Sequence, residues 1–406
     1  MSCLMQGREM PQKRDFIPSP WAHKFTKEQL EKINKFPTVE PGDNYWYHEL
    51  GGENDSIHDT EELRDELLKI DLGMWDYLKN DSGIKDAEKY DLDFLGFLPG
   101  KRESRRYVGD HMLTQNDVRA EGKFDDLIAY GGWSMDDHNP GGFYSEEPPT
   151  IFHKAPSPFG IPYRCIYSKN ISNLFFAGRN ISVTHMALSS TRVMATCATL
   201  GQALGTAAAI ASKYKTSPRG VYEKHIALLK QTLMDDDCYL PFNAHKVSDI
   251  TSKAKITSTG VNAELLRNGK ERKIGDTDNC WVGKPGDTIT FNFDKPEKIH
   301  EIRFVFDSDL NRHTTCPDGI DYMNEHPMIC HVPLDNPPQN VPTTLVKNLK
   351  TEVLTKDGKW TLAVEIKDNH MRLVKQKVNA QTTAVRFTLA ETNGNDTVGI
   401  YSIDLR

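Results

Sequence analysis

The chain has 406 residues, a length that predicts two or three domains rather than a single core. Its composition, 38% hydrophobic and 26% charged, is that of an ordinary globular protein, and no apolar run reaches the roughly 18 residues that a membrane span requires. The formal net charge of -7 argues against a nucleic-acid partner, because such proteins usually concentrate Lys and Arg on one face.

The seven cysteines are scattered and never form a C-x-x-C pair, so buried free thiols are expected rather than a zinc ribbon or a disulfide framework. The first residues of the chain lack the apolar segment of a secretory signal. We expect the natural N-terminus to lie upstream, and we favour a periplasmic or secreted location.

Residues 1–44 are polar and interrupted by prolines, which predicts an extended lead-in without a long helix. The run that begins at Asp59 has apolar residues at helical spacing, so a helix of about 20 residues is predicted there. Its buried positions would be Leu63, Leu67, Ile70 and Met74.

Between Leu92 and Ile166, short apolar pieces separated by Gly and Pro predict strands and loops. The run NLFFAG, which ends at Gly178, is typical of a short strand buried on both faces. A helix is expected from about Ser190 to Tyr214, and its many small residues would let a backbone or a flat ligand approach closely. Helix packing on a sheet is the alternative explanation of those small residues. A second helix is expected from about residue 221 to residue 237.

From about Ile250 the pattern changes to alternating strands separated by Gly, Pro, Asn and Asp, which predicts an antiparallel β-sandwich of about 150 residues. The fold class expected for the whole chain is α+β followed by an all-β sandwich. The α+β part, with mixed sheet and helices, is expected over residues 1–245, and the sandwich over residues 250–406.

The segment from Ser172 to Ala209 contains the most informative chemistry. It predicts a buried strand, a loop with Gly178, Arg179 and Asn180, and a helix that starts at Ser190, Thr191 and Arg192. The first turn of a helix has unpaired backbone N–H groups that favour electron-rich atoms. A reduced flavin, or the carbonyl of an oxidised one, would be favoured by that helix start and by Arg192.

The segment RESRRYVGD concentrates Arg102, Arg105 and Arg106 around Glu103. On a strand, Glu103 and Arg105 share one face, so they can pair and leave a free arginine to hold a carboxylate or phosphate. A solvated strip of ion pairs without a ligand is the alternative.

A third cluster combines Trp133 with Asp136, Asp137 and His138. Acids and a histidine so close in sequence cannot all reach one ion without a sharp loop, so no metal is expected. A turn that lines a substrate pocket, with Trp133 as its stacking wall, is the preferred interpretation.

The segment from Ser172 to Ala209 resembles the last FAD-contacting strand, loop and helix of the FAD-dependent oxidoreductase family related to fumarate reductases. Three further stretches resemble the same family: YWYHELGGEND with DLGMWDYLKN, RESRRYVGD, and FDDLIAYGGWSMDDH. The resemblance implies FAD as cofactor. It places Gly178, Arg179 and Asn180 along the ribityl and pyrophosphate, and Thr191, Arg192 and Val193 at the pyrimidine edge of the ring.

The resemblance also implies functional residues around the ring. His185 would lie near the reacting face, where a histidine can pass a proton while hydride moves to the flavin. A loop histidine bonded to backbone is the alternative. Arg105 and Arg192 are the other expected catalytic residues, and Arg102, Trp133 and His138 are expected in the substrate pocket.

An enzyme of this type should also contain a strand followed by G-x-G-x-x-G and a helix, and this chain has no such segment. A truncated gene, a missing half that is a separate subunit and loss of the cofactor are the three explanations, and we favour the first. A missing Rossmann half would be the partner of this chain. We therefore expect FAD binding by this chain alone to be weak, and the small-residue helix to expose a surface that is normally covered.

Residues 250–406 resemble discoidin-like or galactose-binding-like sandwiches. A sugar site would use residues of its loops, which are Trp281, Arg303, Asp307, Tyr322 and His326. The leading hypothesis is an oxidoreductase that moves hydride from a polar, carbohydrate-like alcohol or an amine to FAD. The alternatives are a non-catalytic carbohydrate-binding or scaffold protein, and a polysaccharide-processing enzyme, since relatives of this architecture carry the label xanthan lyase.

Overall fold

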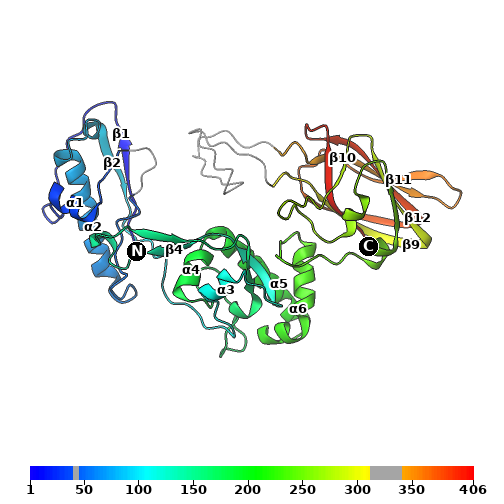
Figure 1. The fold of residues 1–406 in the computed structure, drawn as a ribbon, viewed down its shortest axis with the longest axis horizontal. Helices are drawn as coiled ribbons and strands as arrows, with labels where there is room; N and C mark the ends of the chain where they lie inside the picture. The colour runs from blue at the N-terminus through cyan, green and yellow to red at the C-terminus, as the bar shows by residue number, and fades with distance from the viewer. Residues whose placement is uncertain (40–44, 311–340) are drawn as a thin grey trace. The chain divides into compact units, whose positions relative to one another are not determined.

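The computed structural model describes residues 1–39, 45–310 and 341–406, which form two compact units, Met1–Lys230 (unit 1) and Gln231–Arg406 (unit 2). Figure 1 draws unit 1 from blue to green and unit 2 from green to red. The helices are α1 Lys27–Ile33, α2 Thr60–Asp76, α3 Gln115–Arg119, α4 His185–Thr191, α5 Met194–Lys213, α6 Pro218–Asp235 and α7 Asp249–Lys253. Shorter helical turns are η1 Tyr77–Asp81, η2 Ala87–Lys89, η3 Gly142–Tyr144, η4 Tyr163–Cys165 and η5 Ala263–Arg267.

Unit 1 contains three two-stranded antiparallel sheets, β1–β2, β3–β6 and β4–β5. Their strands are β1 Met5–Glu9, β2 Tyr90–Leu95, β3 Leu127–Gly131, β4 Met135–His138, β5 Thr150–His153 and β6 Phe159–Pro162. These strands fall within the region where alternating short apolar pieces predicted strands, except β1, which lies in the expected extended lead-in.

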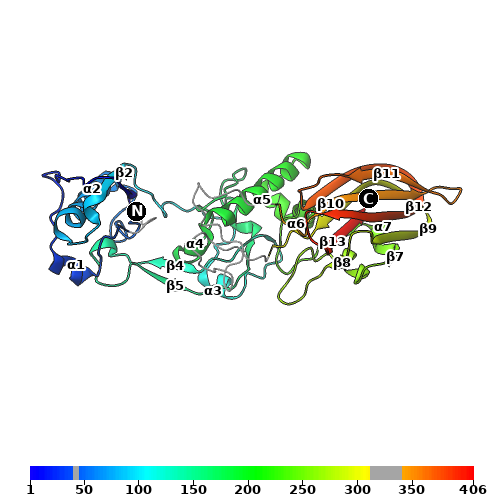
Figure 2. The same cartoon turned by 90° about the horizontal axis from the view of Figure 1, so that it is seen from above.

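Helix α2 confirms the helix predicted from Asp59, and η1 extends it by one turn. Leu63, Leu67, Ile70 and Met74 are buried as the spacing indicated. Figures 1 and 2 show α2 against the β1–β2 sheet, where Trp75 packs on Met5 in a shared apolar cluster. Helix α6 confirms the other predicted helix.

The prediction of a strand at NLFFAG is wrong. The run makes one isolated bridge, between Phe175 and Tyr167, and Phe176 instead stacks on the ring of Tyr107 at 4.8 Å. A strand buried on both faces needs neighbouring strands for its backbone groups. Among the described residues, the segment forms no ladder beyond this bridge, and Phe176 is buried while Leu174 and Phe175 are half-buried.

The helix predicted from Ser190 to Tyr214 is in fact two helices. Thr184 caps α4 by accepting from the backbone N–H of Ala187, and α4 ends at Thr191. Val193 is extended (φ -65°, ψ 144°), and α5 starts after it. Ser190, Thr191 and Arg192 therefore lie at the end of α4, and the free N–H groups of the longer helix belong to the turn that begins at Met194.

Helix α5 packs one face on unit 1 and exposes the other. Leu200, Ala203 and Ala207 are buried, whereas Gly201 and Gly205 are exposed, and a Cβ atom at either glycine would meet nothing within 4 Å. The expectation that this helix exposes a small-residue surface is confirmed, and the expectation of close packing there is not met within the described residues. By length and composition alone, α5 is also the one helix of the described chain that could cross a membrane, which is weak evidence for a span.

Unit 2 is an antiparallel β-sandwich, as predicted. Its strands are β7 Lys255–Ser258, β8 Trp281–Gly283, β9 Thr288–Phe306, β10 Val346–Leu354, β11 Trp360–Ile366, β12 Leu373–Thr392 and β13 Val398–Leu405. The order is β11-β10-β12-β9-β13-β8, with β7 also paired to β9 (Figure 2). The ring of Phe387 on β12 meets Phe291 and Phe304, which lie in the two halves of β9, so both halves face one core.

Strand β9 differs from the prediction of two separate strands. The pieces DTITFNF and IHEIRFVF belong to one strand that continues past Pro296. The pairing of β9 with β12 shifts register between Ala384 and Thr382, which oppose Asn292 and Glu297. Proline cannot donate a ladder hydrogen bond, and a bulge of this kind is where a strand tolerates it.

The expectation of free thiols is met among the described cysteines. Cys3, Cys165 and Cys280 are buried, and Cys197 and Cys238 are half-buried. Burial raises the pKa of the Cys3 and Cys280 thiols to about 12, so neither is reactive at neutral pH. Cys316 and Cys330 lie outside the described residues.

Candidate functional site

A cavity of about 670 Å³ opens in unit 1, within the range of about 300–1,000 Å³ that small-molecule sites occupy. Its wall combines the loop around Glu49, the segment that follows Lys101, strand β4 and helix α4. The residues that carry its chemistry are Glu49, Arg102, Asp136, Asp137, His138, His185 and Arg192.

His138 is held between two carboxylates. Its Nδ1 atom lies 2.6 Å from Glu49 and its Nε2 atom 2.8 Å from Asp136, while the guanidinium of Arg102 approaches the same two ring nitrogens at 3.2 Å and 3.0 Å. Arg102 pairs with the same Glu49. Burial, followed by the charge of Arg192, lowers the pKa of Arg102 to about 10, so its guanidinium stays charged at pH 7.

Arg192 reaches the same network from the end of α4. Its Nη2 atom donates to Asp136 at 2.8 Å, and Thr150 also donates to that carboxylate. Burial alone would raise the pKa of Asp136, but the hydrogen bonds from His138 and Thr150 and the charges of His138 and Arg192 lower it to about 2. Asp136 is therefore an anchor that stays ionised rather than a group that exchanges protons.

His185, the first residue of α4, is held by another pair of acids. Its Nδ1 atom donates to Glu103, and its Nε2 atom lies 3.8 Å from Asp137, which lines the same cavity. A carboxylate at Nδ1 fixes the ring and leaves Nε2 to accept a proton. The expected alternative, a loop histidine bonded to backbone, is wrong, since the ring pairs with carboxylates.

The segment RESRRYVGD is irregular rather than a strand. Glu103 pairs with Arg106 instead of the expected Arg105, because without strand alternation these residues do not share faces as predicted. Arg105 is exposed and does not line the cavity, whereas Arg102 does.

The expected turn after Gly132 is strand β4, which pairs with β5. Asp136, Asp137 and His138 line the cavity from this strand. Trp133 precedes the strand, is 40% exposed and does not line the cavity, and its backbone carbonyl accepts from Ser190. Within the described ranges, no group of three His, Cys, Asp or Glu side chains is arranged to hold a metal ion.

The residues expected at the cofactor lie around the start of α5. Gly178 has φ +99°, Arg179 is exposed, and the carbonyl of Asn180 accepts from Tyr107. Thr191 is fully buried, with its hydroxyl bonded to Ala187, so that side chain does not face a ligand. Val193 is the residue that precedes the first turn of α5.

These residues fit the anionic part of FAD. Helix α5 has no side-chain cap at its start, and Met194 in its first turn is 88% exposed, so backbone N–H groups are accessible there. Burial raises the pKa of the Cys197 thiol, and the positive charge of Arg179 opposes that shift. A phosphate at the helix start would meet backbone N–H groups, and the charge of Arg179 would favour it.

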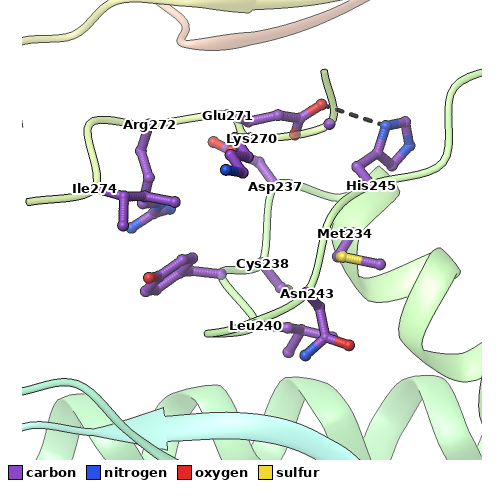
Figure 3. A pocket seen from close by; sticks show the side chains of 12 residues that line it. Met234, Asp237, Cys238, Leu240, Asn243, His245, Lys270, Glu271, Arg272 and Ile274 are labelled. Atoms are coloured by element: carbon purple, nitrogen blue, oxygen red, sulfur yellow. Dashed lines mark ion pairs between the residues drawn. The ribbon is translucent and has the colours of Figure 1, made fainter. Parts of the chain in front are cut away.

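Unit 2 contains a smaller cavity of about 30 Å³, enough for about one water molecule. Figure 3 shows it lined by Asp237, Cys238 and Arg272, with the ion pair between His245 and Glu271 drawn as a dashed line. Its size excludes a sugar.

The expected sugar site in unit 2 is not formed by the described residues. Trp281 and Arg303 are fully buried in the core, so neither can contact a sugar, and Asp307 is half-buried. The alternation that places a residue inward or outward was not visible for these positions because β8 has only three residues and β9 bends. Tyr322 and His326 lie outside the described residues.

Glu49 is a residue of the cavity wall that sequence reasoning did not assign, and Asp136 was predicted only as part of the turn that lines a substrate pocket. Glu49 is separated from His138 by 89 positions, yet it binds both that ring and Arg102. The available signal was an acid two residues before the pair Gly51 and Gly52, in a stretch that already resembled the family.

Residues 3–233 match the family described as FAD dependent oxidoreductase, which is more than half of the chain. The chain therefore belongs to that family, and unit 1 lies almost entirely within the matched range. A comparison with curated proteins finds no significant match.

Among solved structures, the neighbours include carbohydrate-binding modules similar to the sandwich of unit 2. The family 32 module of Streptococcus pneumoniae EndoD is 16% identical with a TM-score of 0.29, and the match covers 39% of this chain and 99% of the module. The family 32 module of C. perfringens NanJ, solved in complex with galactose, is 10% identical with a TM-score of 0.26, and the match covers 39% and 97%. At these values the similarity says nothing about what this chain binds.

Proposed function

We propose that unit 1 oxidises a polar alcohol or amine in the cavity at α4, with FAD as the hydride acceptor. The observation that carries the proposal is His185, which lines the cavity and whose Nδ1 atom is held by Glu103. Membership of the FAD dependent oxidoreductase family supports the redox chemistry. When bound, FAD would supply the two-electron acceptor.

In this proposal, His185 is the general base. The substrate O–H or N–H bond breaks and its proton moves to Nε2, the carbon–hydrogen bond breaks with its electron pair leaving as hydride, and a carbonyl or imine forms. Arg102 and Arg192 do not take protons, since each is held by a carboxylate. Through these ion pairs they hold the cavity wall in position, and they offset the negative charge of the carboxylates near the reacting atoms.

Replacing His185 by glutamine is expected to lower turnover about 10²- to 10⁴-fold, because the base is lost while hydrogen-bonding shape is kept. FAD affinity should not change. Bleaching of the oxidised flavin absorbance by substrate measures turnover, and quenching of flavin fluorescence measures binding. His153→Gln is the control, because His153 lies 3.6 Å from Asp137 but does not line the cavity. Equal losses in both variants would contradict the role given to His185.

The proposed cofactor contacts are Gly178, Arg179, Asn180, Val193 and the first turn of α5. Replacing Arg179 by glutamate should weaken FAD binding at least tenfold, because a carboxylate would repel the phosphates at that helix start. Lys213→Glu makes the same charge change at the far end of α5 and should have little effect. Titration of flavin fluorescence tests both, and unchanged affinity in Arg179→Glu would rule out phosphate binding at this loop.

Carbohydrate binding by unit 2 is a separate proposal. It is supported by a cavity of about 440 Å³ in unit 2, whose wall includes the polar residues Lys347, Glu391 and Asn395. A glycan array probed with the full chain tests it, and Asn395→Ala should reduce any signal. An array without signal would count against a carbohydrate ligand for this unit.

A further inference from the structure

Among the described residues that line the cavity in unit 1, every cationic side chain is already paired with a carboxylate. Arg102 pairs with Glu49, Arg192 with Asp136, and both nitrogens of His138 meet carboxylates. His185 donates to Glu103. An anionic group of a substrate would therefore have to displace an existing ion pair.

Met1 also lines this cavity and does not change that balance, because its backbone nitrogen already donates to the carbonyl of Leu50 at 2.6 Å.

Asp137 is the one wall carboxylate whose contacts are all long. Its oxygens lie 3.6 Å from His153 and 3.8 Å from His185, beyond the length of a hydrogen bond. Its backbone is fixed in β4, where it pairs with Ile151 of β5. With 35% of its side chain exposed, the carboxylate can accept hydrogen bonds from a molecule in the cavity.

We propose that the cavity selects substrates that carry a protonated amino group on a hydroxylated skeleton, with Asp137 as the residue that binds the ammonium. The selection deepens the proposed function, on which it depends. A charge-assisted hydrogen bond to a free carboxylate is stronger than one between neutral groups. A substrate carboxylate would instead face Asp137 with no unpaired cation to offset the repulsion.

The position of Asp137 also suits the reaction. An ammonium bound to Asp137 inside the cavity would lie beside Nε2 of His185, because that nitrogen is 3.8 Å from the same carboxylate. A hydroxyl or amine on the neighbouring carbon would then be within reach of the general base. Asp137 is accordingly a specificity-determining residue rather than a proton acceptor.

The test uses three six-carbon ligands that differ at one end: glucamine (ammonium), glucitol (hydroxyl) and gluconate (carboxylate). Isothermal titration of the full chain without FAD gives each dissociation constant. Glucamine should bind most tightly, at least tenfold more tightly than gluconate. In Asp137→Asn, the preference for glucamine should fall to near unity, while Asp55→Asn, which removes another wall carboxylate, should keep it.

Tightest binding by gluconate, absence of binding by all three ligands, or an unchanged preference in Asp137→Asn would overturn the proposal. Circular dichroism melting confirms that the variant is folded, and the order of the three ligands on the unmodified protein needs no variant. The two proposals fail separately. Preference for glucamine without FAD binding would contradict the oxidoreductase, whereas FAD binding with preference for gluconate would contradict only the selection.

Discussion

Replacing Arg303 by alanine is expected to destabilise unit 2 by about 3–5 kcal/mol, the cost of leaving a buried charge without its partner. Arg303 is fully buried, pairs through two nitrogens with Glu271, and donates to the carbonyls of Met234 and Asp235. Its loss would leave the Glu271 carboxylate with His245, at 3.4 Å, as its remaining ion-pair partner, and would leave two backbone acceptors unpaired. Hydrogen–deuterium exchange across a urea series, read from peptides of unit 2, measures the change.

The matched control is Arg386→Ala in the same sandwich. Arg386 pairs with Glu352 at 2.9 Å, but 30% of the arginine and 22% of the glutamate remain exposed. Such a pair contributes about 1 kcal/mol or less. A double variant, Arg303→Met with Glu271→Gln, should regain part of the stability, because no uncompensated charge remains. Equal losses for Arg303→Ala and Arg386→Ala would contradict this account of the core.

Replacing Asp136 by asparagine is expected to cost unit 1 about 2 kcal/mol at pH 7 and to remove part of its acid sensitivity. The folded-state pKa of Asp136 is about 2, below its ordinary value of 3.8. A carboxyl with a lowered pKa stabilises the fold above its unfolded pKa, and this stability is lost as pH falls from about 4 towards 2. The variant should therefore show a smaller loss over that window.

Unfolding free energies of both proteins between pH 7 and pH 2 test this prediction, with exchange read from peptides of β4 and β5. Asp93→Asn is the control. Asp93 pairs with Arg8 at 3.0 Å in an exposed contact, so its removal should change stability by less than about 1 kcal/mol. An Asp136→Asn protein with the same pH slope as the unmodified one would show that other carboxyls dominate acid unfolding.

The fold was predictable where one side-chain pattern continues along a single regular helix or strand. Leu63, Leu67, Ile70 and Met74 indicated α2, and stretches of alternating residues in β9 and β12 indicated the sandwich. The break between α4 and α5 was not predictable, because it depends on the backbone of Val193 and on the cap at Thr184, while the residues around both are compatible with one helix. The strand expected at NLFFAG was wrong for a different reason, since an apolar run indicates burial but does not specify a pairing partner.

Some of the predicted site residues line one cavity and others do not. Arg102, His138, His185 and Arg192 line it, whereas Arg105 and Trp133 do not. The pairing partners of these residues were not predictable from sequence, because pairing Glu49 with His138 or Asp136 with Arg192 requires knowledge of which distant segments lie together. The role proposed for Asp137 rests on its distances to His153 and His185, which no sequence pattern contains.

The long strands β9 and β12 have a mechanical consequence for unit 2. Each pairs along its whole length, so one half of β9 contacts β7 and the other half contacts β13. A pulling force on β7 or on β13 is therefore transmitted to the same two strands, β9 and β12. The strands on one side of the sandwich cannot separate from β9 and β12 while those on the other side keep their hydrogen bonds. Under force, this sandwich should rupture in a single event, without a half-open intermediate.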